Sequence, residues 1–220
     1  MTKNINYREF LAGGLFLFVE EEHIQKALEN IDRTTKRKLR EEAKALLVML
    51  YYTGCRPSEA LLAKSNQIEN DNGLIKIRLV TLKRGRARTI WLSPKKFPMV
   101  KILWQWHLKK YHEEYLFFHF MGRYKHKKIW KKKDGTSTEK EYIEISPRLP
   151  YYFERWFEGI ITHGINPYYL RHNKFSKLAE RDKITDRGLM QMKGSTTYAS
   201  IAPYIHQSAE FGKKMATKGG

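Results

Sequence analysis

Residues 39–62 read LREEAKALLVMLYYTGCRPSEALL, and this stretch decides how the chain begins to fold. Apolar side chains recur at helical spacing through its first part, which predicts a buried helix. Gly54 follows where a left-handed helix end is expected, and Pro57 suits the first position of a second helix. We therefore expect two helices joined by a tight corner, with Arg56 at that corner.

Outward from this corner the pattern changes to strands and then returns to helices. Residues 68–92 have strand character on both sides of a basic turn, residues 81–88, which predicts a β-hairpin. Three helices are expected farther along the chain, over residues 100–115, 150–161 and 171–181. The first of them would place Trp104, Leu108 and Tyr111 on one face. The predicted fold class is α+β, mainly helical, with a small antiparallel sheet or hairpin.

Lysine is concentrated in residues 122–138, and Asp134-Gly135 lies near the end of this segment. Such a charged segment with a turn dipeptide predicts an exposed loop or hairpin. A solvated surface insertion without a partner is an equally open interpretation.

Length and charge limit the classes of protein that fit. The 220 residues suit one large domain, and 42 Lys and Arg against 23 Asp and Glu give a net charge of +19. The electrostatic field of such a charge attracts polyanions, and nucleic acid is the first candidate. Residues 10–19 are apolar but too short to span a bilayer, so we expect a cytoplasmic protein and no membrane partner. A lone cysteine, Cys55, excludes an internal disulfide and a cysteine-based metal cluster.

Residues 53–59, TGCRPSE, resemble the first arginine box of the tyrosine recombinases, the lambda-integrase and Xer-like family. The resemblance implies that Arg56 forks onto two oxygens of a DNA phosphate and that Glu59 orients it. A purely structural role, in which Arg56 caps a helix and pairs with Glu59, is the alternative.

Residues 167–172, PYYLRH, resemble the second box of the same family. Arg171 would be the second phosphate clamp. Tyr168 stands where the family usually has histidine, and a phenol can hydrogen-bond to phosphate but is a poor base at neutral pH. His172 is the next candidate for handling a proton, although it can equally be a packed or helix-capping group.

The family carries a lysine at the tip of the hairpin between these boxes, where it protonates the departing 5′ oxygen. Lys83 fits that place. Arg84, Arg86 and Arg88 would grip the DNA backbone and lower the pKa of the lysine by repulsion. A basic turn that only touches DNA is the alternative.

The closing box of the family ends in the nucleophilic tyrosine. Ser195 stands where a histidine or tryptophan normally contacts the scissile phosphate, and Lys193 can supply a donor that serine supplies weakly. The family spacing, counted from Gly194, reaches Tyr204, which we expect to be the nucleophile. Tyr198 is a rival, but it lies too close to Gly194 for that spacing.

Together these matches imply a site-specific recombinase or integrase that forms a 3′-phosphotyrosyl link to DNA. No metal or cofactor is expected, because arginines take the role that magnesium has in other phosphoryl transfers. The implied partners are double-stranded DNA and further copies of the chain, in a dimer or tetramer. A weakened DNA-binding relative and an enzyme like type IB topoisomerases are the alternatives.

The matches also suggest a division of the chain. Residues 36–206 would be the catalytic domain, after a short extension over residues 1–35 and before a tail over residues 207–220. Substituted accessory residues such as Tyr168 and Ser195 are similar to those of divergent archaeal and viral integrases, which suggests a mobile element or an archaeal virus as the source and the host cytoplasm as the location.

Overall fold

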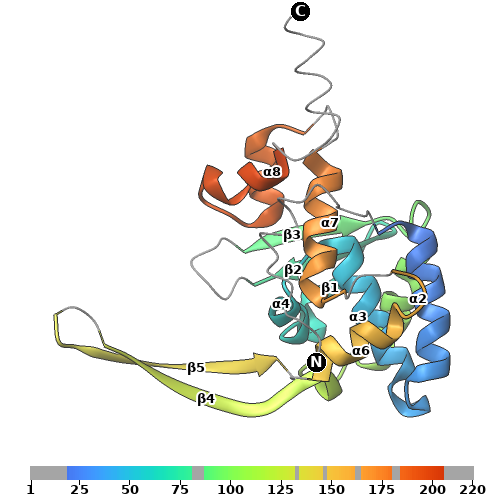
Figure 1. Ribbon diagram of the computed structural model, residues 1–220, viewed down its shortest axis with the longest axis horizontal. Helices are drawn as coiled ribbons and strands as arrows, with labels where there is room; N and C mark the ends of the chain where they lie inside the picture. The colour runs from blue at the N-terminus through green and yellow to red at the C-terminus, as the bar shows by residue number, and fades with distance from the viewer. Residues whose placement is uncertain are drawn as a thin grey trace, which may run out of the picture.

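The computed structural model describes residues 19–80, 87–131, 134–145, 148–161, 165–179 and 184–205. These residues form mainly helices together with two small antiparallel sheets (Figure 1), which confirms the predicted class. The helices are α2 (Glu21–Thr34), α3 (Arg40–Thr53), α4 (Pro57–Leu61), α5 (Val100–Lys109), α6 (Arg148–Trp156), α7 (Pro167–Ala179), α8 (Asp186–Lys193) and α9 (Ala202–Ile205). The strands are β1 (Ile68–Asp71), β2 (Leu74–Leu79), β3 (Arg88–Leu92), β4 (Met121–Lys131) and β5 (Ser137–Ile145). Short 3-10 turns are η1 (Arg37–Leu39), η2 (Ser65–Gln67), η3 (Phe118–Phe120) and η4 (Tyr198–Ser200).

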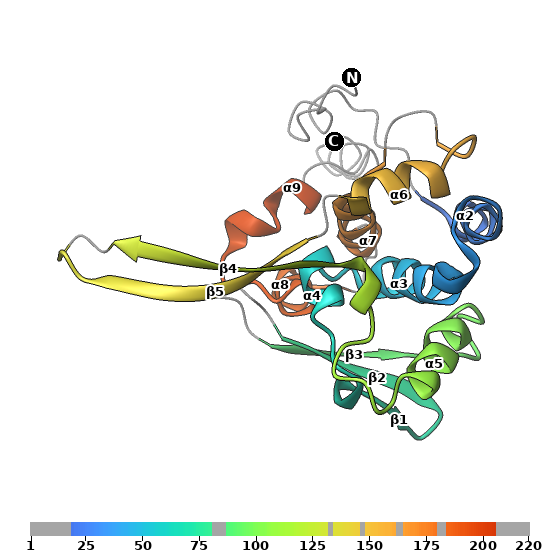
Figure 2. The same cartoon turned by 90° about the horizontal axis from the view of Figure 1, so that it is seen from below.

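Helix α3 is the centre of the core. It contacts α2, α5 and α7, and nearly all of its residues are buried. Figure 2 shows α5 and the three-stranded sheet on one side of α3, with α6 and α7 on the other. A helix surrounded in this way must be apolar around most of its circumference, which is what the sequence of α3 provides.

Helix α2 falls within the segment 1–35 that the sequence suggests as an extension. Its buried face joins the same core as α3 and consists of Ile24, Ala27, Leu28 and Ile31. Residues 21–34 therefore pack as part of the main core.

The corner after α3 forms as the sequence predicts. Gly54 has a φ of 60°, and its N–H donates to the carbonyl of Leu50 at 3.0 Å. A side chain at Gly54 would also meet α7, because a Cβ there would lie 2.9 Å from Cγ of Lys174. Glycine thus provides both the left-handed conformation and the close approach of α7 to the end of α3.

The three-stranded sheet has the order β1-β2-β3 and extends the predicted hairpin by one strand. Asn72 and Gly73 make the turn between β1 and β2 with φ values of 52° and 80°, a conformation that suits an Asn-Gly hairpin. Ile75, Ile77 and Leu79 alternate inward along β2 and fix its register. The basic turn that joins β2 to β3 lies largely outside the described residues.

The helix predicted over residues 100–115 is shorter than expected. It ends at Lys109, so Tyr111 lies beyond the helix and does not share a helix face with Trp104 and Leu108. The indole N–H of Trp106 donates to the carbonyl of Leu116 at 2.8 Å, which holds the returning chain against the helix. This hydrogen bond, between residues ten positions apart, favours an early end of the helix, which helical periodicity does not reveal.

Helix α7 begins earlier than the predicted residue 171. Asn166 Oδ1 accepts hydrogen bonds from the backbone N–H groups of Tyr168 at 2.9 Å and Tyr169 at 3.2 Å, and Pro167 takes the first helical position. Asn166 thus caps the helix, and Pro167 is its first residue. As a result Tyr168 and Arg171 lie on one helix.

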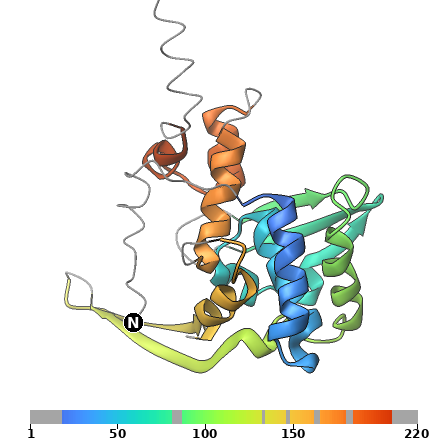
Figure 3. The same cartoon turned by 45° about the vertical axis from the view of Figure 1, so that its right-hand side comes forward.

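Strands β4 and β5 form a hairpin from the lysine-rich segment and project away from the body (Figures 1 and 3). Strand β5 contacts α4, the helix that follows Arg56. We call this hairpin, residues 121–131 and 137–145, the arm. None of the helices in the described part of the chain is long and apolar enough to cross a membrane.

Candidate active site

The first part of the site is a buried carboxylate between two arginines. Arg56 Nη1 lies 2.6 Å from Glu59 Oε1, and Arg88 Nη2 lies 2.9 Å from Glu59 Oε2. The backbone N–H of Arg56 also donates to Oε2 at 2.9 Å. Burial alone would raise the pKa of Glu59, but Arg88 and Arg56 hold the pKa below its ordinary value. Glu59 therefore orients Arg56 as a permanent anion.

Arg88 differs from the exposed DNA grip that the sequence suggests. It is the first residue of β3, and its side chain is only 4% exposed. Nε and Nη1 of this guanidinium are buried and find no hydrogen-bond partner within the described part of the chain. Arg88 therefore holds the carboxylate of Glu59 from within the core.

The second arginine connects two chain segments. Arg171 Nη1 donates to the carbonyl of Gly54 at 2.6 Å, and Nη2 donates to the carbonyl of Lys193 at 3.0 Å. Its guanidinium stacks over Phe175, 4.8 Å from the ring centroid. Burial, reinforced by the nearby Arg56, lowers the pKa of Arg171 to about 10, so it still carries its charge at neutral pH. Arg171 thus joins the corner after α3 to the end of α8.

The predicted nucleophile lies beside a histidine of α7. The hydroxyl of Tyr204 is 2.8 Å from Nδ1 of His172, and the ring packs near Phe175. Burial raises the pKa of Tyr204 to about 12, while Arg171 and Arg56 act in the opposite direction. Burial also lowers the pKa of His172 to about 4, helped by Lys193 and Arg171. At neutral pH the pair is therefore a neutral phenol next to a neutral imidazole.

Lys193 lies over the ring of the same tyrosine. Its Nζ lies 4.5 Å from the centroid of the Tyr204 ring and donates to the carbonyl of Ser200. Burial, followed by repulsion from Arg171 and Arg56, lowers the pKa of Lys193 to about 8. Lys193 is thus a partly buried cation against the ring of Tyr204.

Ser195 is held within its own turn. Gly194 ends α8 with a φ of 70°, and the backbone N–H of Ser195 returns to the carbonyl of Met190 at 2.9 Å. Its hydroxyl contacts the hydroxyl of Ser200 and lies 3.3 Å from the carbonyl of Thr197. The hydroxyl of Ser195 therefore contacts only groups within residues 195–200 in the described part of the chain.

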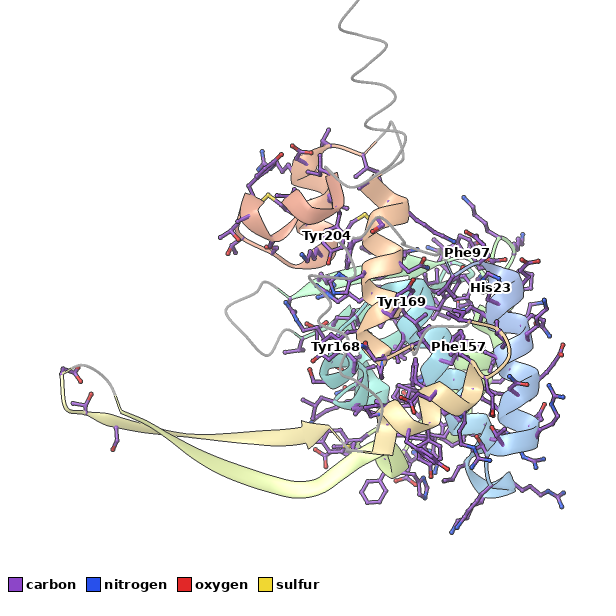
Figure 4. All side chains as sticks on the ribbon, viewed as in Figure 1. His23, Phe97, Phe157, Tyr168, Tyr169 and Tyr204 are labelled. Atoms are coloured by element: carbon purple, nitrogen blue, oxygen red, sulfur yellow. The ribbon has the colours of Figure 1, made fainter. Side chains whose placement is uncertain are left out.

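Two tyrosines lie outside this group. Tyr168, near the start of α7, is 43% exposed. In Figure 4 it lies well below Tyr204, which belongs to α9. Tyr198, the rival nucleophile, is 48% exposed in η4. Lys83, Arg84 and Arg86 lie outside the described residues.

The structure thus brings together six of the residues that the sequence suggests and adds contacts that the sequence did not indicate. The grouped residues are Arg56, Glu59, Arg171, His172, Lys193 and Tyr204. The added contacts are the inward pairing of Arg88 and the carbonyls of Gly54 and Ser200. The described residues contain no group of His, Cys, Asp and Glu side chains that could hold a metal ion.

The fold is that of a tyrosine-recombinase catalytic domain. A family model described as the phage integrase family matches residues 18–210. The chain belongs to this family, which confirms the resemblance drawn from the arginine boxes.

Solved structures of recombinases have the same fold. XerH recombinase bound to a palindromic difH substrate, in a post-cleavage complex, matches with a TM-score of 0.63 at 19% identity, covering 91% of this chain and 52% of that one. XerA recombinase matches with a TM-score of 0.58 at 16% identity, covering 92% and 64%. The Tn1549 transposon integrase, in complex with transposon right end DNA, matches with a TM-score of 0.56 at 14% identity, covering 92% and 65%. This chain thus spans between half and two thirds of their length, and no curated protein matches it.

Proposed function

We propose that this chain is a site-specific DNA recombinase or integrase that cleaves and rejoins DNA strands through Tyr204. The observation that carries the proposal is the hydroxyl of Tyr204, 2.8 Å from His172 Nδ1 and within the field of Arg56 and Arg171. The net charge of +19 and membership of the phage integrase family support the same reading.

Cleavage begins with loss of the phenolic proton. Because the phenol is neutral at pH 7, a base must take the proton as the oxygen attacks, and the unprotonated imidazole of His172 is in hydrogen-bonding reach. The bond from the Tyr204 oxygen to phosphorus forms while the bond from phosphorus to the 5′ oxygen breaks. We assign the proton that the 5′ oxygen receives to Lys83. The 3′-phosphotyrosyl link conserves the energy of the broken phosphodiester bond. The 5′ hydroxyl of a second DNA end can therefore attack this link, rejoin the strand and release Tyr204.

Charge stabilisation supplies most of the rate in this proposal. Arg56 and Arg171 would neutralise the negative charge that develops on the non-bridging phosphate oxygens. Lys193, over the ring of Tyr204, would favour the developing phenolate. Because cations of the chain fill this role, we propose that cleavage requires no metal ion and continues in a chelator.

The wider setting follows from this chemistry. The proposed substrates are two DNA duplexes held by a dimer or tetramer of the chain. We propose residues 36–206, together with α2, which shares their core, as the catalytic domain. We propose an archaeal viral or other mobile element acting in the host cytoplasm as the biological context. Tyr168 and Ser195 remain proposed phosphate contacts of secondary weight.

A covalent trapping experiment tests the proposal without knowledge of the target site. Nicked duplexes with a randomised centre are incubated with the protein in EDTA, and DNA that stays attached to protein in detergent is recovered and sequenced. We expect an adduct with the natural chain and with Tyr198→Phe, and a loss of about 10⁴-fold or more with Tyr204→Phe. An adduct that survives Tyr204→Phe would overturn the assignment of the nucleophile.

A further inference from the structure

A buried amide on α7 ties this helix to the chain just before α2. The N–H of Val19 donates to Oδ1 of Asn173 at 2.9 Å, and Nδ2 of Asn173 donates to the carbonyl of Val19 at 3.0 Å. Both residues are buried. The chain thus enters α2 beside the middle of α7 (Figure 3), where both polar atoms of one side chain hold it.

Lys177 adds to the same attachment. It lies four residues after Asn173, so the two side chains share one face of α7. Its Nζ donates to the carbonyl of Val19 at 2.9 Å and lies 2.6 Å from a carboxylate oxygen of Glu20. We call the contacts of Asn173 and Lys177 with Val19 the clasp. The clasp joins segments that are 154 positions apart in the chain.

The clasp lies on the side of α7 opposite to Arg171. An α-helix turns by about 100° per residue, so Arg171 and Asn173 leave the helix about 200° apart. Arg171 is held by the carbonyls of Gly54 and Lys193. Hydrogen bonds are directional, whereas apolar packing is not. Polar anchors on nearly opposite sides therefore fix the rotation of α7 about its own axis.

His172 lies between these two anchors, and its position depends on the rotation that they set. Its Nδ1 is 2.8 Å from the hydroxyl of Tyr204. Turning α7 by about 10° would move an atom about 5 Å from the helix axis by about 1 Å. A displacement of that size is enough to break a hydrogen bond.

We propose that Asn173 is a positioning residue, which fixes the rotation of α7 through the backbone of Val19 and thereby the orientation of Arg171 and His172 for cleavage. This inference rests on the proposed function, because it gives Asn173 a part in the cleavage step. The amide of Asn173 is itself bonded to Val19 and acts only through α7. Loss of the clasp should slow cleavage with little change in DNA affinity, which depends on many phosphate contacts.

Asn30 provides a matched control, because it is also a buried asparagine that ties two distant segments together. Its Nδ2 donates to the carbonyls of Trp156 and Glu158, both at 3.0 Å, and so joins α2 to the end of α6. Asn173→Leu and Asn30→Leu each replace such an amide by an apolar side chain of similar size. Both should lower the urea midpoint, because buried backbone groups lose their partners. Adduct formation and affinity are measured where circular dichroism shows both variants to be folded.

We expect Asn173→Leu to slow adduct formation at saturating DNA by about 10- to 100-fold, because a small misplacement of reacting groups has an effect of this size. Its affinity for the same duplex, measured in Tyr204→Phe, should stay within about threefold. Asn30→Leu should form the adduct within about threefold of the natural rate. Equal slowing in the two variants, or a natural rate in Asn173→Leu, would overturn the proposal. If Asn173→Leu does not fold, Asn173→Asp, which keeps the acceptor but loses the donor, replaces it with the same criteria.

A measurement that needs no cleavage separates this inference from the proposed function. Burial, helped by Lys193 and Arg171, lowers the pKa of His172 to about 4. Rotation of α7 would carry the ring out of this environment, so an NMR titration should show the pKa of His172 rising in Asn173→Leu and unchanged in Asn30→Leu. If this shift occurs but the natural chain forms no adduct with any duplex, the catalytic proposal fails while the role of Asn173 in orienting α7 is supported. An unchanged pKa of His172 in Asn173→Leu would contradict that role.

Discussion

The two halves of the candidate active site rest on buried clusters of very different size. The arginine half, with Arg56, Glu59, Arg88 and the corner at Gly54, is built on the large core that includes α3. The tyrosine half is carried by α8, η4 and α9. Among the described residues its buried cluster is small, and it consists of Phe175, Leu178, Leu189, Ile201 and Tyr204.

This difference indicates that the two halves are held in place with different rigidity. The proposed phosphate clamp is already fixed by ion pairs and backbone carbonyls in the chain by itself, whereas the proposed nucleophile is attached through a few contacts to α7 and β3. Segments with little buried apolar area open at lower free energy than the rest of a protein. We therefore expect the tyrosine half to open locally while the clamp stays folded.

The largest effect is expected when the buried anion of the clamp is removed. Glu59→Gln keeps the size of the side chain but leaves Arg88 buried without its charge partner, which should cost about 3 to 5 kcal/mol of unfolding free energy. Urea denaturation measures this. The control is Glu69→Gln, which breaks exposed pairs with Lys76 and Arg78 and should leave the midpoint nearly unchanged. Equal midpoints for both variants would show that the clamp is not a buried ionic network.

A second pair of variants compares the two cores directly. Leu47→Ala in α3 and Ile201→Ala beside Tyr204 each remove a fully buried side chain. Leu47→Ala should lower the global unfolding free energy by about 2 to 5 kcal/mol. Ile201→Ala should instead raise amide hydrogen exchange over residues 184–205 and leave the global value less changed. A global loss as large as that of Leu47→Ala would show that both halves unfold as one unit.

The sequence was sufficient where the signal is local. The corner at Gly54 and the strand character of residues 68–92 depend on neighbours in the chain, and both are found in the structure. The arginine boxes are local patterns as well, and the family that they suggest matches the chain. The start of α7 was missed because Asn166 before Pro167 fits a turn as well as a helix cap.

Contacts between distant segments could not be predicted in the same way. His172 and Tyr204 are 32 positions apart, and only the packing of α9 on α7 brings their side chains together. The sequence of the basic turn does not show that the side chain of Arg88 points into the protein. It does so because Glu59, its ion-pair partner, lies within the core. Burial, which sets the pKa of each group at the site, likewise appears only in three dimensions.

Acid should act on the tyrosine half through His172. The pKa of this imidazole is about 4 in the folded chain against an ordinary 6.5, so between these pH values the unfolded chain binds more protons. Stability therefore falls as pH drops from 6.5 to 4, by up to about 3 kcal/mol from this group. His172→Gln should lose less stability than the natural chain over that range, measured by urea denaturation at each pH.

Tyr204→Phe provides the control for this pH effect. It removes the hydroxyl partner but keeps the imidazole buried, and because burial is the main cause of the lowered pKa, the natural pH dependence should persist. A flat profile in Tyr204→Phe would instead assign the effect to the hydrogen bond. Hydrogen exchange over residues 184–205 at pH 5 would show whether the loss is local.

The smallest effect is expected at Ser195, where the family usually places a stronger donor. The hydroxyl of Ser195 is occupied by Ser200 and by the carbonyl of Thr197, whereas Lys193 lies against the ring of Tyr204. Ser195→Ala should therefore slow adduct formation by less than about tenfold, or about 1.4 kcal/mol of barrier. Lys193→Met, measured beside it, should cost more, because it removes a cation from the proposed nucleophile. If Ser195→Ala proved the more harmful of the two, the turn after α8 would have to rearrange on DNA so that serine reaches the phosphate, and the tyrosine half would then be more mobile than its contacts indicate.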